Sequence, residues 1–139
     1  MLGVHASPSA DDGPGIKPGT PDDQLDGLLA GCAADIVIGG HTHRAADRVI
    51  GRIRALNPGS TGIPERPGEA GWLLLDLDGN QERLGAPKRD RPGVGVEHRM
   101  VAFDVDAVVR DLGARLHPNA EFLEAILTGK RPQRVARDA

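Results

Sequence analysis

The sequence is short of aromatic residues, cysteine and long apolar runs. It contains two Phe, one Trp and no Tyr, which is thin material for a domain core. Cys32 is the only cysteine, so an internal disulfide and a C-x-x-C metal motif are both excluded, and a small buried or half-buried thiol is expected. Apolar runs such as residues 72–75 are far too short to span a membrane.

A strong excess of charge of one sign is also missing. The chain has 17 basic and 20 acidic residues, and its formal net charge of −3 gives no reason to expect a nucleic-acid partner. The one basic cluster, at residues 130–134, is interpreted as a solvated tail. Residues 1–5 contain neither the basic start nor the apolar stretch of a secretory signal, so we expect a soluble cytoplasmic protein without a membrane partner.

What the chain does contain is a set of short elements joined by many turns. Its 139 residues are enough for one domain with a buried core, and 19 Gly with 11 Pro indicate a loop-rich domain. Strands are expected at residues 2–4, at 36–38 in a buried central position, on both sides of Gly51 between 48 and 56, at 71–77 and at 98–105. Turns are expected at 57–60 and 78–80, and loops at 7–21 and 85–95.

Three helices are expected from capping residues and from apolar residues at helical spacing. The first begins with Thr20 as its N-cap and ends at Gly31. The second is expected to be capped by Asp106, and the third to cover residues 118–127. Strands and helices mixed in this way predict an α/β fold class.

Two of the five histidines flank a threonine shortly after the apolar segment at residues 36–38. A Gly-Gly pair separates that segment from His41 and His43, and paired glycines allow unusual backbone angles and close approach to a ligand. If the strand continued through the glycines, both rings would point to one face; if a loop begins there, the rings can diverge. Because imidazole is the commonest neutral metal ligand, the pair is a candidate metal site. The alternative is two loop histidines, one of them bonded to backbone.

His5 strengthens the metal hypothesis. It too follows a short apolar segment, and chemistry in open α/β sheets gathers at the carboxyl ends of the strands. The candidate metal ligands are therefore His5, His41 and His43. The other two histidines, His98 in an alternating strand and His117 before a proline, are interpreted as surface or capping residues.

Four boxes occur in one order: V-H-A-S-P at residues 4–8, G-H-T-H at 40–43, N-P-G-S-T-G at 57–62 and G-W-L-L-L-D at 71–76. This series resembles the C-terminal half of the calcineurin-like metallophosphoesterase superfamily, in its small single-domain bacterial phosphodiesterase branch. The resemblance covers residues 1–128 as a partial domain and leaves 129–139 as a charged C-terminal tail. The third box is interpreted as a structural turn without a chemical role.

The resemblance implies both a fold and a metal chemistry. The fold is a two-sheet αββα sandwich, of which this chain would be the C-terminal half and therefore incomplete. Members hold two divalent metals that share a bridging water or hydroxide, and two metals about 4 Å apart can clamp the attacking and leaving oxygens of a phosphate ester. By resemblance, His5 and His41 match ligands of one metal and His43 matches a ligand of the other. Mn, Fe, Ni or Zn would suit such ligands.

The chain departs from the superfamily in the boxes that carry carboxylates. The D-x-H, G-D and G-N-H boxes of the first half are absent from the sequence. Asp11, Asp12 and Asp47 are not obvious replacements, and Asp35 is expected at the wrong end of its strand. A two-metal site needs a bridging carboxylate, and catalytic zinc sites keep at least three protein ligands. We therefore expect this chain alone to be weakly active or inactive, although the resemblance favours an enzyme.

The sequence supports two functions. The first is a metal-dependent phosphoesterase that hydrolyses a small phosphodiester or phosphomonoester, represented here by its C-terminal part. The second is a non-catalytic remnant that binds at most one metal and acts as an interaction module, for example as a homo-oligomer formed through an open sheet edge. A single structural zinc on all three candidate histidines is a weaker third hypothesis. Because the chain begins inside an expected strand, we also expect a gene model that starts late, at an internal Met.

Overall fold

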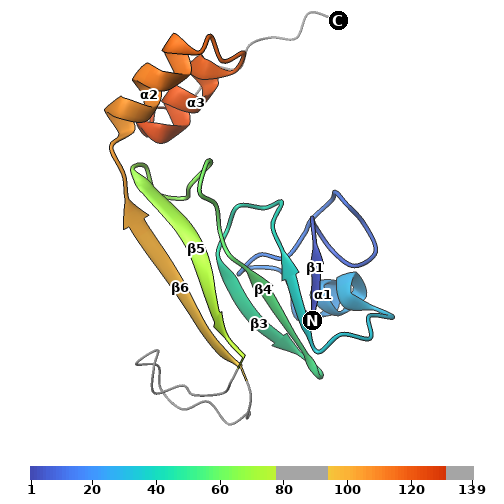
Figure 1. Ribbon diagram of the computed structural model, residues 1–139. Helices are drawn as coiled ribbons and strands as arrows, with labels where there is room; N and C mark the ends of the chain where they lie inside the picture. Colours follow the sequence, from blue (N-terminus) through green and yellow to red (C-terminus); the bar gives the residue numbers. More distant parts are fainter. Residues whose placement is uncertain (78–93, 131–139) are drawn as a thin grey trace, which may run out of the picture.

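The computed structural model describes residues 1–77 and 94–130, and within these ranges the chain forms six strands and three helices. They are, in chain order, β1 (Leu2–Val4), α1 (Asp22–Leu29), β2 (Ile36–Gly39), β3 (Ala46–Ile50), β4 (Ile53–Asn57), β5 (Glu69–Asp76), β6 (Gly95–Ala102), α2 (Val105–Ala114) and α3 (Ala120–Leu127). Figure 1 shows a body of β1 to β4 with α1, a ribbon of β5 and β6 beside it, and a helical hairpin beyond the ribbon. The expected turn at 78–80, most of the loop at 85–95 and most of the C-terminal tail lie outside the described residues.

The first sheet contains four strands in the order β1-β2-β4-β3. β1 pairs with β2 and β2 with β4 in parallel, while β3 and β4 form an antiparallel hairpin that turns at Gly51. The parallel pairing places the carboxyl ends of β1 and β2 at one edge, with Val4 opposite Gly39. β2 is a central strand, as predicted from its continuous apolar run, because neighbouring strands flank it on both sides.

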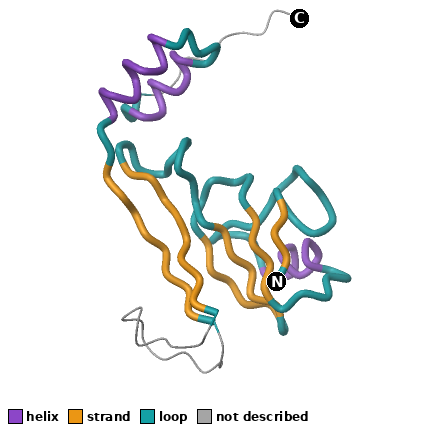
Figure 2. The backbone as a smooth tube through the Cα atoms, in the orientation of Figure 1, coloured by secondary structure: helices purple, strands orange, loops and turns teal. Residues whose placement is uncertain are grey.

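The core lies between this sheet and α1, which Figure 2 shows packed against the strands. Leu25 and Leu29, four residues apart on one face of α1, are both buried. The other buried members of the cluster are Ile16, Val37, Ala46, Ile53 and Ala55. Full burial of a Leu or Ile side chain contributes about 1.5–3 kcal/mol. Aliphatic side chains therefore form the core of this chain, which has few aromatic residues.

The start of α1 differs from the sequence-based expectation. Its N-cap is Pro21 rather than Thr20, and Leu25 N donates to the Pro21 oxygen at 2.9 Å. The Thr20 hydroxyl is buried and has no hydrogen-bond partner among the described residues. The Thr20 carbonyl accepts a hydrogen bond at 2.8 Å from Arg48 of β3, so this residue contacts the sheet and not the helix end. The end of α1 agrees with the prediction, because Gly31 follows it with a φ of 75°.

β6 and α2 both begin earlier than the sequence pattern predicts. The strand expected at 98–105 is observed at Gly95–Ala102, where it pairs along its whole length with β5. Asp104 then caps α2, since its carboxylate accepts a hydrogen bond from Ala107 N at 2.9 Å. The expected cap, Asp106, lies in the first turn, where an acidic side chain still favours the helix N-terminus.

The second sheet is an antiparallel ribbon of β5 and β6. Hydrogen bonds attach it to the first sheet and its connections. They join Gly71 N to Ser60 O at 2.8 Å, His98 Nε2 to Asn57 O at 2.8 Å, and Arg54 Nη1 to Val94 O at 3.1 Å. One face of the ribbon is therefore turned toward the end of β4, where the candidate ligands of the next section lie.

α2 and α3 form a helical hairpin that Figure 1 shows at the far end of the ribbon, away from the first sheet. Phe103 N donates to Gly68 O at 3.1 Å, which ties the start of the hairpin to the residue before β5. No residue of α2 is buried, and Leu127 is the buried residue of α3. Among the described helices, none combines the length and the apolar character that crossing a membrane requires.

Candidate metal centre

His5 and His41 meet at the carboxyl edge of the first sheet. His5 follows β1 directly, and His41 follows β2 after one glycine. Because the two strands are parallel neighbours, their carboxyl ends coincide, and Gly40 N donates to the His5 carbonyl oxygen at 2.8 Å. The structure thus brings together two candidate ligands that are separated by 36 positions in the sequence.

The ring nitrogens of these two histidines face each other. His41 Nδ1 lies 3.1 Å from His5 Nε2, with ring centroids 4.9 Å apart and ring planes inclined by 72°. The second ring nitrogen, His41 Nε2, lies 3.1 Å from the carbonyl oxygen of Gly13. A carbonyl oxygen can only accept a hydrogen bond, so Nε2 of His41 carries a proton; in the neutral ring Nδ1 then presents a lone pair toward His5.

This arrangement fits a shared metal ion. Two nitrogens bound at about 2.1 Å to one tetrahedral zinc lie about 3.4 Å apart, a little more than the 3.1 Å between His41 Nδ1 and His5 Nε2. Metal-binding histidines almost always donate their second N–H to a carboxylate, a carbonyl or water, which fixes the tautomer and the ring orientation. For His41, the Gly13 carbonyl is the acceptor of this second N–H.

His43 does not join this pair. His41 and His43 both have positive φ angles, 49° and 59°, and Thr42 between them donates its backbone N–H to Gly40 O at 2.5 Å. The chain therefore turns sharply after β2, which corresponds to the loop alternative. Over residues 1–77 and 94–130, no three His, Cys, Asp or Glu side chains are grouped closely enough to hold a metal ion, so the single three-histidine zinc site is not formed.

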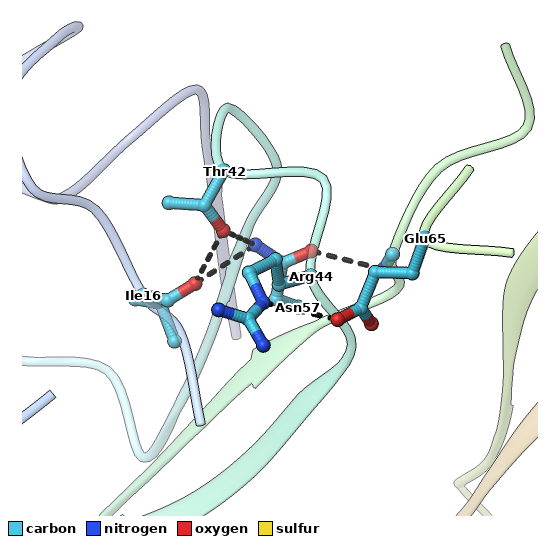
Figure 3. A network of polar contacts seen from close by, with 6 residues as sticks. Ile16, Thr42, Arg44, Asn57 and Glu65 are labelled. Atoms are coloured by element: carbon cyan, nitrogen blue, oxygen red, sulfur yellow. Dashed lines mark hydrogen bonds and ion pairs between the residues drawn. The ribbon is translucent and has the colours of Figure 1, made fainter. Parts of the chain in front are cut away.

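A buried amide holds this turn. Asn57, the last residue of β4, is 0% exposed. Its Nδ2 lies 2.6 Å from Gly40 O and 2.9 Å from both Ile16 O and Thr42 Oγ1. The Thr42 hydroxyl donates in turn to Ile16 O at 2.9 Å (Figure 3). One side chain therefore connects β4, the turn after β2 and the loop that precedes α1.

That loop is also packed directly against the two histidine-bearing strand ends. Gly15 is buried and has a φ of 55°. A Cβ atom at this position would lie 2.7 Å from Thr42 Cγ2 and 3.4 Å from His41 Cδ2. Glycine is required here both by the left-handed backbone and by the close approach, and it allows residues 13–16 to cover the G-H-T-H box.

Two acidic residues considered as replacement ligands are engaged elsewhere. Asp35 precedes β2, at the opposite end of that strand from His41, and pairs with Arg52 at 2.5 Å. Asp47 pairs with Arg54 through two contacts of 2.8 and 2.7 Å. The hydrogen bond that Arg54 donates to Asp47 is the main reason why the pKa of Arg54 is raised above its ordinary value.

The interpretation of His98 as a surface or capping residue is wrong. It is half-buried, and its Nε2 lies 2.8 Å from the backbone oxygen of Asn57. His117 agrees with its interpretation: it is exposed, and its Nδ1 accepts a hydrogen bond at 3.1 Å from Asn119 N just before α3. The N-P-G-S box does form the expected turn, with Gly59 at a φ of 84°, but its asparagine also holds the candidate site.

Comparison with known proteins gives this geometry a context. The chain matches the model of the calcineurin-like phosphoesterase superfamily domain over residues 10–80, just over half of its length. In three dimensions it resembles hypothetical protein PH1004 from Pyrococcus horikoshii OT3, with a TM-score of 0.69 and 19% sequence identity. This likeness covers 95% of the chain and 47% of PH1004, so the chain spans about half the length of its structural neighbour. No curated protein matches the sequence significantly. The likeness concerns the fold, and it agrees with the predicted partial α/β fold of two sheets.

Proposed function

The chain belongs to the calcineurin-like phosphoesterase superfamily, and from this premise we propose that it takes part in the metal-dependent hydrolysis of a small phosphate ester. The superfamily typically uses divalent metal ions. The observation that supports the proposal most directly is the pair of facing nitrogens, His41 Nδ1 and His5 Nε2, at 3.1 Å. In this proposal the pair, held at the carboxyl edge of the first sheet, supplies two of the ligands of a metal site.

In this proposal His5 and His41 hold one divalent ion, and His43 contributes to a second. Mn, Fe, Ni or Zn would suit imidazole ligands combined with carboxylates. Divalent ions at this edge would supply positive charge to the oxygens of a phosphate ester and lower the pKa of water. The Gly13 carbonyl keeps the proton of His41 on Nε2, and the exposure of His5 leaves the edge accessible to a substrate.

We further propose that this chain alone is a weak catalyst. Within the described ranges the pair of histidines lacks a third ligand of the His, Cys, Asp or Glu type, whereas catalytic zinc sites normally have three. PH1004 is about twice as long as the part that this chain matches. Carboxylates that bridge two ions would therefore have to come from outside the described residues.

The test combines metal binding with turnover. The purified chain is dialysed against Mn²⁺ or Zn²⁺, its bound metal is counted, and it is assayed with bis-p-nitrophenyl phosphate and p-nitrophenyl phosphate. We expect at least one bound ion per chain and slow hydrolysis that requires the metal. His41→Ala should lose both, while His117→Ala, a change at an exposed histidine outside the pair, should keep both. Hydrolysis that persists without metal, or in His41→Ala, would contradict the proposal.

A second candidate function is a non-catalytic module that pairs with a second copy of the chain. It is favoured by the lack of a three-ligand group in the described residues and by the position of β1, an edge strand whose Leu2 is exposed. A stable dimer by light scattering, together with bound metal but no turnover, would support this function over the first. We also propose a cytoplasmic location, which suits a chain with a single cysteine, and cell fractionation would test it.

A further inference from the structure

We propose that Asn57 is a positioning residue that, through Thr42, presents His41 to His5 as a ready-made metal-binding pair. This inference rests on the proposed function, because it assigns the pair of histidines to metal binding. It adds a role for the N-P-G-S box, which the sequence pattern explains only as a turn.

The first argument is the burial of the Asn57 amide. The residue is 0% exposed, and an amide buried without partners is strongly unfavourable. Every polar atom of its side chain has a partner: Nδ2 approaches Gly40 O, Thr42 Oγ1 and Ile16 O, and Oδ1 accepts from Gly59 N at 2.9 Å. A turn alone would need only the bond to Gly59. The three contacts of Nδ2 are therefore not explained by the turn.

The second argument is where those contacts fall. Gly40 and Thr42 are the residues on either side of His41, so the Asn57 amide holds the backbone carbonyl immediately before the candidate ligand and the side-chain hydroxyl immediately after it. The ring of His41 is held separately, by the carbonyl of Gly13. Backbone and ring are thus fixed by two different contacts, and both lead to the loop at 13–16, since Asn57 Nδ2 also approaches Ile16 O at 2.9 Å.

The third argument is the backbone conformation. His41 has a φ of 49° and His43 a φ of 59°, in the left-handed region that residues with a Cβ rarely occupy. Such conformations persist only where the surroundings over-determine them, and they cluster at functional sites. Here the surroundings are Asn57 and the Thr42 hydroxyl, which donates to Ile16 O at 2.9 Å. Without them the segment would relax to ordinary angles, and His41 Nδ1 would no longer face His5.

The consequence is a metal site that is arranged before any metal arrives. Partners that orient ligand residues typically change metal affinity by about 10- to 100-fold when they are removed. Asn57 and Thr42 touch no ligand nitrogen, so their effect would pass entirely through the position of His41.

The variants are Thr42→Val, which removes the hydroxyl with little change of shape, and Asn57→Ala, which removes the amide. Ser60→Ala is the matched control in the same box, because Ser60 Oγ accepts a hydrogen bond from Ile63 N at 2.9 Å and does not contact the histidine turn. If Asn57→Ala does not fold, Thr42→Val still tests the positioning role.

Two readouts are needed. The affinity for Co²⁺ is measured by titration at a temperature well below that of unfolding. The number of imidazoles bound to Cu²⁺ is measured by pulsed electron paramagnetic resonance. We expect two imidazoles in the unchanged chain and in Ser60→Ala. We expect one imidazole and a roughly 10- to 100-fold weaker Co²⁺ affinity in Thr42→Val. Two imidazoles with unchanged affinity in both Thr42→Val and Asn57→Ala would overturn the positioning role.

A third readout needs no metal and separates this inference from the proposed function. Hydrogen exchange of the Gly40 amide, which donates to His5 O at 2.8 Å, should accelerate in Thr42→Val and stay slow in Ser60→Ala. If the unchanged chain binds no metal but shows this pattern, the proposed function fails and Asn57 still positions the turn. If it binds metal and Gly40 exchange is equal in all variants, the positioning inference is the part that fails.

Discussion

The imidazole of His98 crosses from the ribbon to the first sheet, where its Nε2 lies 2.8 Å from the backbone oxygen of Asn57. His98 is paired in register with Leu73 across the ribbon, on the face turned toward the end of β4. Asn57 uses its side chain for the turn that carries His41 and its carbonyl for His98. One buried residue therefore connects the ribbon with the turn that carries His41.

Replacement of His98 by Leu should destabilise the chain. The change removes a hydrogen bond to the buried carbonyl of Asn57, and such a bond contributes about 0.5–1.5 kcal/mol. His117→Ala is the control, since this histidine is exposed and its loss should change stability by about 0.5 kcal/mol or less. The measurement is the free energy of unfolding in urea. Equal values for the two variants would show that the His98 bond contributes nothing to the junction between the sheets.

Most of the fold could be predicted from local patterns. The apolar run of β2 predicts a central strand, and Leu25 with Leu29 predicts the buried face of α1. The helix starts were less predictable, because tertiary contacts determine which of several neighbouring residues becomes the N-cap. Arg48 engages the carbonyl of Thr20, and Asp104 is available as a cap because β6 ends before it.

The candidate site could be predicted only in part. His5 and His41 follow apolar segments, and two parallel strands place such residues at one edge. The separation of His43 was predicted only through the resemblance, which assigns it to the other metal; the residues themselves left it open, because it depends on the left-handed turn. The roles of Asn57 and His98 were equally hidden, since each depends on a partner about 40 positions away or on a different sheet.

The ion pair between Asp47 and Arg54 should contribute measurably to stability. Both side chains are only 18% exposed, and two hydrogen bonds join them diagonally across the β3–β4 hairpin. Asp47→Asn should cost about 2 kcal/mol, less than a fully buried pair would. Asp35→Asn, in the exposed pair with Arg52, should cost at most about 0.5 kcal/mol. Chemical unfolding of both variants gives the comparison, and an Asp35 effect as large as that of Asp47 would contradict the role of burial.

Glu97 and Arg99 should give the ribbon a measurable response to acid. The hydrogen bond from Arg99 at 2.8 Å is the main cause that lowers the pKa of Glu97 below its ordinary value of 4.5. A group whose pKa is lower in the folded state stabilises the fold above its unfolded pKa, and this contribution is lost as the pH falls through the folded pKa. Arg99→Gln should therefore raise the pKa of Glu97 toward 4.5 and reduce the loss of stability on acidification.

Trp72 offers a direct optical measurement of that response. It is the only Trp in the chain, and Arg99 Cζ lies 5.2 Å from its ring centroid. Protonation of Glu97 releases one partner of Arg99, so the fluorescence of Trp72 should change below pH 4.5 in the unchanged chain. In Arg99→Gln the same acid titration should leave the emission nearly constant. An identical transition in both proteins would mean that another group reports on the tryptophan.

The last prediction concerns the glycine beneath the histidine turn. Gly15→Ala adds a Cβ 2.7 Å from Thr42 Cγ2 at a residue whose φ is 55°, so it should push the turn away from the loop and separate His41 from His5. Gly31→Ala is the matched control, because Gly31 also has a positive φ, 75°, but a Cβ there meets nothing within 4 Å.

Both variants should lose about 1–2 kcal/mol from the left-handed backbone alone. Gly15→Ala should lose roughly 1–3 kcal/mol more through the overpacked contact, and only this variant should bind Co²⁺ more weakly. Urea unfolding and Co²⁺ titration of the two proteins measure these differences. Equal stability and equal Co²⁺ affinity would mean that the loop at 13–16 does not press on the turn, and that His41 is held from the side of Asn57 alone.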